Sequence, residues 1–224
     1  MPSSAAIIRC LSVPLIVAVQ WFEQNNQIAS LQKEKSETEL NLLKQQINPH
    51  FFFNILNNLY ALSITKDKRT PEVILQLSEL MRYVIYKGKE EVVPIAEEIK
   101  YIEDYIDLQQ IRLHKQLDVQ FEKSLSDEQQ LIPPLLFIIF VENAFKHGIE
   151  PAEAACFLHL SLHSDEKELV FECVNSIEHQ LNQPKGIGLE NLKRRLDLHF
   201  TNRYELNISE TPKQFKAFLK IKTA

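Results

Sequence analysis

The chain has 224 residues, 45% of them hydrophobic and 25% charged, a composition that is typical of globular proteins and argues against disorder. Its formal net charge of −5, without a basic stripe, argues against nucleic acid as the main partner. The three cysteines, Cys10, Cys156 and Cys173, form no CxxC pair and indicate buried thiols in a reducing compartment. The length suffices for one or two domains.

The N-terminal segment is mostly apolar between residues 5 and 22. Its length approaches that of a membrane span, although Arg9 would be costly inside a bilayer, and Trp21 suits an interface. Residues 1–22 are therefore expected to form a transmembrane or membrane-proximal helix, with an amphipathic or wrongly assigned leader as the alternative. Residues 23–39 are polar with sparse apolar positions, which indicates a linker or a short coiled coil.

A long helix is expected from about Leu31 to Thr65, because apolar residues recur there at steps of three and four. Pro49 lies within it, and a proline inside a helix costs about 3 kcal/mol. His50 follows on the flank of the apolar stripe. It is either a reactive histidine, since imidazole is largely neutral and nucleophilic near neutral pH, or a satisfied histidine at the edge of a bundle.

Two further helices are expected, one restarting at Thr70 as its cap and one from Ile95 to Leu113. Because two antiparallel helices cannot bury both apolar stripes alone, residues 40–115 are expected to pair with a second copy as a four-helix bundle. The charged residues of the last helix are expected to form a solvated face: Glu97, Glu98, Lys100, Glu103, Asp104 and Asp107.

From residue 116 the pattern becomes mixed α and β. Strands are expected at 117–121, 157–162, 169–174, 204–208 and 215–221, a loop or lid at 176–185, and a helix to Phe200 with Leu192, Leu196 and Leu198 inside.

Two features of this half suggest a ligand site. Seven apolar residues precede a helix end on which four polar residues share one face: Glu142, Asn143, Lys146 and His147. That face serves a ligand or is an ordinary helix end with a Glu142–Lys146 ion pair. Gly186 and Gly188 come before the next helix, where free N–H groups can bind phosphate, although a lone GxG is weak evidence.

Four stretches, in this order, resemble the LytS-type (YehU-like) sensor histidine kinases: QQINPHFFFNILNNL at 45–59, EEIKYIEDYIDLQQIR at 97–112, PPLLFIIFVENAFKHGI at 133–149 and GIGLENLKRRL at 186–196. The resemblance covers about residues 40–222. It implies an α+β fold: a helical dimerisation hairpin at 40–115, forming a four-helix bundle as a homodimer, then an ATP-binding α/β-sandwich domain at 116–224, of the kind shared by gyrase, Hsp90 and histidine kinases.

The resemblance also implies the activity. His50 would be phosphorylated by ATP with Mg²⁺, and the phosphoryl group would pass to an aspartate of a response regulator, usually of the LytTR kind, in two-component signalling. The imidazole would attack the γ-phosphate to give a phosphoramidate, and Asn54 belongs to the same catalytic stretch. The protein would reside at the bacterial inner (cytoplasmic) membrane, with its catalytic part in the cytoplasm.

The resemblance assigns nucleotide roles residue by residue. Asn143 would hold Mg²⁺, with Lys146 and His147 facing the phosphates. Gly186 and Gly188 would cradle the nucleotide tail. Further nucleotide contacts are expected from Asn175, which is placed to accept from the adenine amino group, and from Leu189, Asn191 and Arg195.

Two departures from the family pattern limit these assignments. Phe51 stands where many histidine kinases have an acidic residue, which leaves Glu142 as the candidate base. The usual Asp-x-Gly-x-Gly adenine loop is absent, and Asn175 stands near its start, where a neutral oxygen makes a weaker contact than a carboxylate. The alternative function is therefore a catalytically weak, membrane-tethered dimeric scaffold.

Overall fold

The computed structural model describes residues 21, 24, 49–113, 115–178 and 187–222, with only the backbone described at 49–50 and 187–191. The chain divides into two compact units, Met1–Asn48 and Pro49–Ala224. The expected N-terminal helix and linker lie outside the described residues, except for Trp21 and Gln24, which are helical and exposed. Among the residues that the structure describes, no helix is long and apolar enough to cross a membrane.

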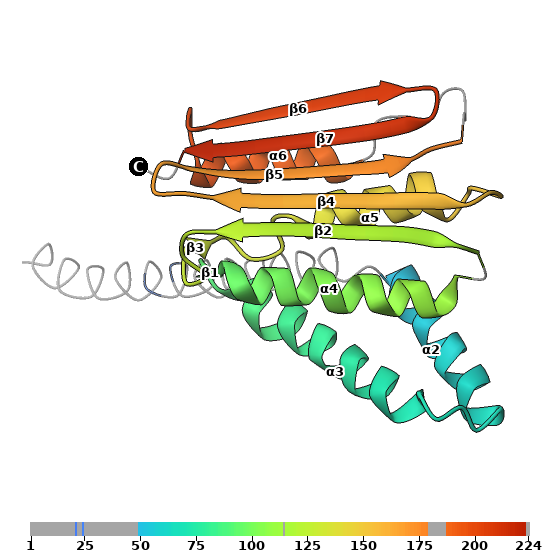
Figure 1. The fold of residues 1–224 in the computed structure, drawn as a ribbon. Coiled ribbons are helices and arrows are strands. Elements are labelled where there is room, and N and C mark those ends of the chain that lie inside the picture. Colours follow the sequence, from blue (N-terminus) through green and yellow to red (C-terminus); the bar gives the residue numbers. More distant parts are fainter. Residues whose placement is uncertain (1–20, 22–23, 25–48, 114, 179–186, 223–224) are drawn as a thin grey trace, which may run out of the picture. The chain divides into compact units, whose positions relative to one another are not determined.

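The second unit starts with the helices α2, α3 and α4. The rest of its chain forms a sheet that carries helices on one face (Figure 1). Its helices are α2 (Pro49–Ile64), α3 (Thr70–Tyr86), α4 (Ile95–Arg112), α5 (Ile138–Ala144) and α6 (Ile187–His199), with a 3-10 turn η1 (Lys87–Lys89) and a π-helical turn η2 (Phe145–Ile149). Its strands are β1 (Val93–Pro94), β2 (Leu117–Leu125), β3 (Leu131–Ile132), β4 (Cys156–Ser164), β5 (Glu168–Ser176), β6 (Tyr204–Thr211) and β7 (Gln214–Lys222).

The main sheet has the strand order β2-β4-β5-β7-β6. The β2–β4 pair is parallel and the other pairs are antiparallel. Burial alternates along β4 and β5, as expected for a sheet with one covered face. Phe171 of β5 stacks against Phe137, with ring centroids 4.6 Å apart, and lies 5.6 Å from Phe140 of α5. The expected α+β architecture, with an α/β sandwich in the C-terminal half, is confirmed.

The start of α3 differs from the sequence expectation. Thr70 is not the cap residue: its hydroxyl donates to the Asp67 carbonyl at 2.7 Å, and Arg69 occupies the cap position without a side-chain bond to the helix. The Asp67 carboxylate instead accepts from the Arg69 backbone N–H at 2.9 Å and from its guanidinium. An aspartate two residues before the cap position therefore orders the turn that the expectation assigned to the threonine.

The expected solvated face of α4 is wrong at two positions. Glu98 is fully buried and Asp104 is 5% exposed. α4 has buried residues around most of its circumference, because it contacts α2, α3 and α5. A sequence signal did exist, since Glu98 lies three residues after Ile95 and four before Ile102, on the apolar face of the helix.

The inner face of α6 also differs. Leu192 and Leu196 are fully buried, as expected, but Leu198 is 74% exposed. Residues four apart share a helix face, whereas a residue two positions further on points to the opposite side. The free thiols of Cys156 and Cys173 are buried, as the cysteine spacing predicts, while Cys10 lies outside the described residues.

Candidate functional site

The polar residues after the apolar run emerge at the end of α5. The buried α5 continues as the π-helical turn η2, in which Phe145 and Gly148 are buried while Lys146 and His147 are exposed. Glu142 and Asn143 are partly exposed on the last turn of α5. Single π-helical turns inside helices occur frequently at functional sites. The side chains of Lys146 and His147 therefore reach the surface directly after the buried helix.

The far end of η2 is held by the last residue of α4 and by Lys115, which follows that helix. The Lys115 ammonium donates to the backbone carbonyls of Ile149 and Ala152, and to that of Glu150 at 3.2 Å. Arg112 forms an ion pair with the Glu150 carboxylate. These contacts satisfy the carbonyls at the end of the turn, where a helix lacks internal donors.

Asn175 lies at the end of β5, beside this turn. It is 1% exposed, and its Nδ2 donates to the Ser176 carbonyl at 2.9 Å. Its Oδ1 is buried without a hydrogen-bond partner among the described residues. A buried acceptor left unpaired costs about 1–3 kcal/mol. This atom therefore suits the donor group of a ligand, as the expected contact to an adenine amino group requires.

The structure explains on steric grounds why position 148 is a glycine. A Cβ at this position would lie 2.1 Å from Asn175 Nδ2 and 2.5 Å from the Ser176 carbonyl oxygen. Both distances are far below van der Waals contact, so a side chain here would displace the end of β5. The glycine expected to close the helix thus permits the close approach of η2 to Asn175.

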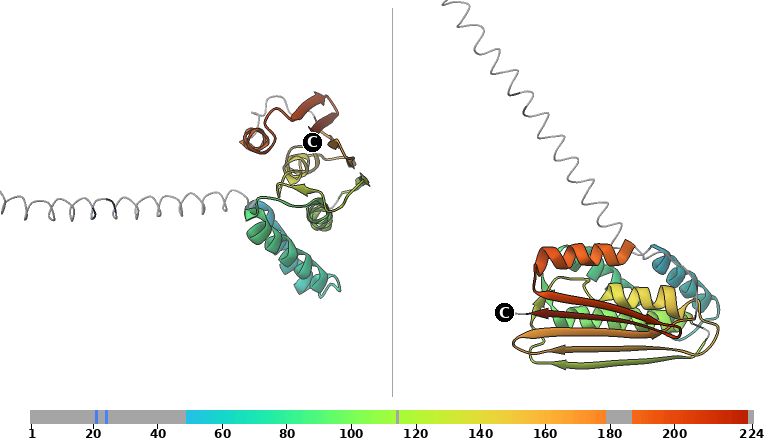
Figure 2. Two further views of the ribbon diagram at one scale, coloured as in Figure 1. Left: turned by 90° about the vertical axis from the view of Figure 1, so that its left-hand side faces the viewer. Right: turned by 90° about the horizontal axis from the view of Figure 1, so that it is seen from above.

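α6 lies on the same face of the sheet as α5, and the two helices contact each other (Figure 2). Gly188 and Leu189 belong to the first turn of α6, followed by Asn191, whereas Gly186 lies outside the described residues. The first turn of a helix offers unpaired N–H groups that bind phosphate. Arg195 has a different environment: its guanidinium donates to the carbonyls of Pro134 and, at 3.3 Å, Leu135.

Aromatic rings connect the start of α2 with η2. Phe51 stacks on Tyr105 of α4 at 4.5 Å, and Tyr105 meets Phe145 edge to face at 5.8 Å. All three rings are at least 95% buried. Phe51 directly follows His50, and Phe145 directly precedes Lys146. Of His50 the structure describes the backbone in the first turn of α2, and Asn54, one turn later, is half-buried.

The charge of Glu142 acts on two tyrosines of α4, Tyr105 and Tyr101. Burial and then the negative charge of Glu142 raise the pKa of Tyr105 well above its ordinary value, and the same two causes raise the pKa of Tyr101. The Glu142 carboxylate therefore lies within electrostatic reach of the ring on which Phe51 stacks.

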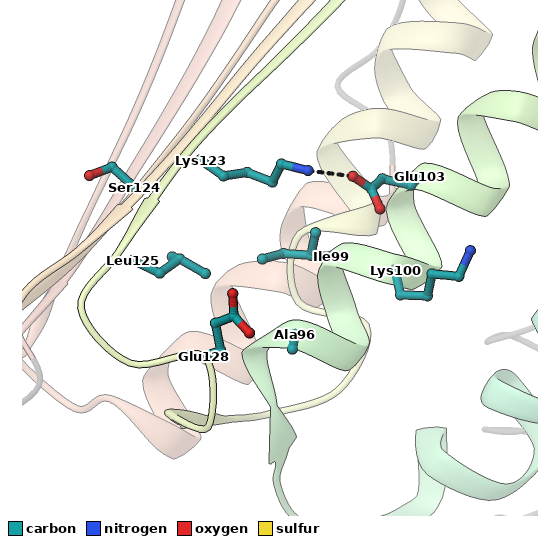
Figure 3. Close-up of a pocket in the computed structure, with 8 residues that line it drawn as sticks. All are labelled: Ala96, Ile99, Lys100, Glu103, Lys123, Ser124, Leu125 and Glu128. Carbon is teal, nitrogen blue, oxygen red and sulfur yellow. Dashed lines mark hydrogen bonds and ion pairs between the residues drawn. The ribbon is translucent and has the colours of Figure 1, made fainter.

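Two hollows in the described part of the chain lie away from these residues. One of about 470 Å³ lies between α4 and β2, crossed by the Lys123–Glu103 ion pair (Figure 3). An adjoining hollow of about 450 Å³ continues along the same two elements. None of the site residues expected from the sequence lines either hollow.

Comparisons with known proteins agree with the expected family. Residues 38–117 match the family model described as histidine kinase. Sensor protein LytS of Staphylococcus saprophyticus is 30% identical over 186 residues, 77% of this chain and 32% of that protein. Sensor histidine kinase BtsS of Escherichia coli K12 is 25% identical over 182 residues, 80% of this chain and 32% of that protein.

Among solved structures, the histidine kinase domain of the Erythrobacter litoralis EL346 blue-light activated histidine kinase matches with a TM-score of 0.45 and 12% identity, covering 77% of this chain and 92% of that chain. The chain spans about a third of the length of the curated relatives it matches.

Proposed function

We propose, from its similarity to the LytS-type sensor histidine kinases, that this chain transfers the γ-phosphoryl group of ATP to His50 and then to an aspartate of a response regulator. The observation that carries the proposal is the stack of Phe51, Tyr105 and Phe145. It ties the turn that contains His50 to the turn that exposes Lys146. Phosphoryl transfer depends mainly on positioning and on charge neutralisation, which is what such an arrangement offers.

ATP fits the polar residues around η2. The unpaired Asn175 Oδ1 would accept from the adenine amino group, Lys146 and His147 would face the phosphates, and Asn143 would give an amide oxygen to Mg²⁺. The N-terminal turn of α6 would receive phosphate oxygens. Gly186, Leu189, Asn191 and Arg195 remain predicted contacts, and Arg195 acts on the backbone before α5.

The proposed transfer to His50 is a nucleophilic displacement at the γ-phosphorus of ATP. An imidazole nitrogen of His50 forms the P–N bond while the bond from the γ-phosphorus to the bridging oxygen breaks and ADP leaves. The imidazole proton is taken by a base, for which Glu142 is the candidate carboxylate. In the second step the regulator aspartate attacks phosphorus and the His50 nitrogen leaves.

Exposed apolar side chains support the proposed homodimer. On α2 they recur at steps of three and four and are at least 51% exposed: Phe53, Leu56, Tyr60 and Ile64. On α3, Ile74 and Leu75 are 51% and 63% exposed. A monomer seldom presents so much apolar surface on adjacent helices, and a second copy would cover it as a four-helix bundle.

The remaining proposals follow from the family. The partner would be a response regulator of the LytTR kind. Residues 1–22 would attach the chain to the bacterial inner membrane and 23–39 would link it to the phosphotransfer helices of 40–115, with the ATP-binding domain of 116–224 in the cytoplasm.

The deciding experiment incubates the full chain with γ-labelled ATP and Mg²⁺. An acid-labile, alkali-stable label is expected, and it is lost in His50→Gln but kept in His163→Gln, which removes an exposed histidine of β4. If the chain neither became labelled nor bound nucleotide, the proposed kinase activity would be wrong. Nucleotide binding without any label would instead support the scaffold, which the missing adenine-loop glycines favour.

A further inference from the structure

The carboxylate of Glu98 joins three segments inside the second unit. Its Oε2 accepts from the Leu135 backbone N–H at 2.7 Å and from the Tyr83 hydroxyl at 2.8 Å, and its Oε1 accepts from the Phe137 N–H at 3.2 Å. Tyr83 belongs to α3, Glu98 to α4, and the two backbone groups to the turn that leads into α5. A fully buried carboxylate survives in a fold only when it is paired in this way.

The turn that Glu98 holds is strained. Leu135 is 5% exposed and has φ 56°, the left-handed conformation that costs a residue with a side chain about 1–2 kcal/mol. Its N–H donates to Glu98 of α4 and its carbonyl accepts from Arg195 of α6. Two oppositely charged side chains from two helices therefore bind opposite sides of the same strained residue.

The two charges also stabilise each other. Burial raises the pKa of Glu98, and its hydrogen bonds and the charge of Arg195 oppose that rise. Burial lowers the pKa of Arg195, and the charge of Glu98 opposes that fall. Removing either group would leave a buried charge with less compensation.

This junction connects the parts of the proposed active site. The Leu135 turn leads into α5, whose end carries Asn143. α6, which supplies Arg195, begins with the turn expected to bind phosphate. Tyr83 lies on α3, which packs with α2 in the hairpin that contains His50.

We propose that Glu98 is a positioning residue for phosphoryl transfer: it sets the Leu135 turn that aligns α5 and α6 around the nucleotide, and through the Tyr83 hydroxyl it ties the His50 hairpin to that alignment. The inference rests on the proposed function. It predicts two separable effects, because the Glu98 contacts with the turn serve the nucleotide site and the Tyr83 contact serves the hairpin.

The first test measures binding of the ATP analogue AMP-PNP with Mg²⁺ to the full chain by calorimetry, and it needs no phosphorylation. Glu98→Gln keeps the shape but places an NH₂ against donors. We expect the affinity to fall about tenfold or more, the effect of losing one hydrogen bond to a charged group. Asp104→Asn is the matched control, since Asp104 is also buried on α4 but pairs with Lys100 at 2.7 Å. If Glu98→Gln, Asp104→Asn and the parent bound AMP-PNP with equal affinity, the proposed role of Glu98 in the nucleotide site would be wrong.

The second test separates positioning from stability. Tyr83→Phe removes the hydroxyl and retains the ring, which stacks on Tyr101 at 4.7 Å. AMP-PNP affinity should stay within about twofold, while the single-turnover rate of His50 labelling at saturating ATP falls about tenfold. Tyr86→Phe, on the same helix and 67% exposed, should keep both values.

The outcomes distinguish the two proposals. A labelling rate of Tyr83→Phe equal to that of Tyr86→Phe would overturn the coupling. If Tyr83→Phe lost AMP-PNP affinity and labelling rate to the same extent, the Tyr83 hydroxyl would have only a structural role, and the coupling would again be refuted. A parent chain that binds AMP-PNP but is never labelled would refute the proposed function, and the Glu98→Gln binding result would still decide the role of the turn. Should Glu98→Gln fail to fold, Tyr83→Phe decides.

Discussion

The close approach of η2 to β5 predicts a large effect from one methyl group. In Gly148→Ala the new Cβ would lie 2.1 Å from Asn175 Nδ2, 2.5 Å from the Ser176 carbonyl oxygen and 3.3 Å from Asn175 Cγ. Asn175 is 1% exposed, so neighbouring atoms must shift if its side chain is to move away from the new methyl group. Overpacking of this kind costs about 1–3 kcal/mol.

The assay is urea unfolding of the full chain followed by circular dichroism, together with the thermal midpoint. We expect a loss of about 1–3 kcal/mol in the free energy of unfolding, or a fall of about 2–12 °C in the midpoint. AMP-PNP affinity should fall as well, because Asn175 must move. The reasoning would be refuted if Gly148→Ala unfolded at the parent's urea midpoint with the parent's affinity.

A second variant separates the two clashes. Adding Asn175→Ala to Gly148→Ala removes the amide contacts but leaves the Ser176 carbonyl in place. The double variant should therefore recover part of the lost stability, as expected for residues in direct contact. Simple additivity of the two single changes would show that the contact is not the cause.

Three further predictions concern the helical hairpin, the contact of Asn175 with adenine, and the dependence of stability on pH. Phe51→Ala should destabilise the chain by about 3–5 kcal/mol in urea unfolding, because Phe51 is buried against another ring, whereas Phe53→Ala, at a 66% exposed position, should weaken dimerisation measured by analytical ultracentrifugation. Asn175→Leu should weaken ATP binding about tenfold in calorimetry and leave binding of ITP, which lacks the amino group, unchanged; equal losses for both nucleotides would contradict the adenine contact. Hydrogen bonds from Arg69 lower the pKa of Asp67 from 3.8 to about 2, so its contribution to stability is present above pH 3.8 and disappears as the pH falls towards 2. Asp67→Asn should remove that part of the acid dependence of the thermal midpoint, and an unchanged profile would contradict it.

The alternating and three-to-four patterns of the sequence determined the main elements. The five long strands and the helices α3, α4 and α6 lie where apolar periodicity predicts them, because the period of side-chain directions is a local property of the backbone. The four ordered motifs predicted the family with which the comparisons agree. The prediction of a polar face at the end of α5 was also local, and the structure exposes Lys146 and His147 there.

The partners of each face were decided only by the tertiary structure. The charge of Glu98 suggested a solvated position, although its spacing from Ile95 and Ile102 puts it on the apolar face of α4. In the structure this carboxylate is the buried acceptor for two backbone groups and a tyrosine. The unpaired Oδ1 of Asn175 and the steric demand on Gly148 arise from residues 27 positions apart that meet where η2 reaches β5. Periodicity tells which side of a helix is apolar; which neighbour covers it, and which polar atom that neighbour must satisfy, depends on contacts between segments distant in the chain.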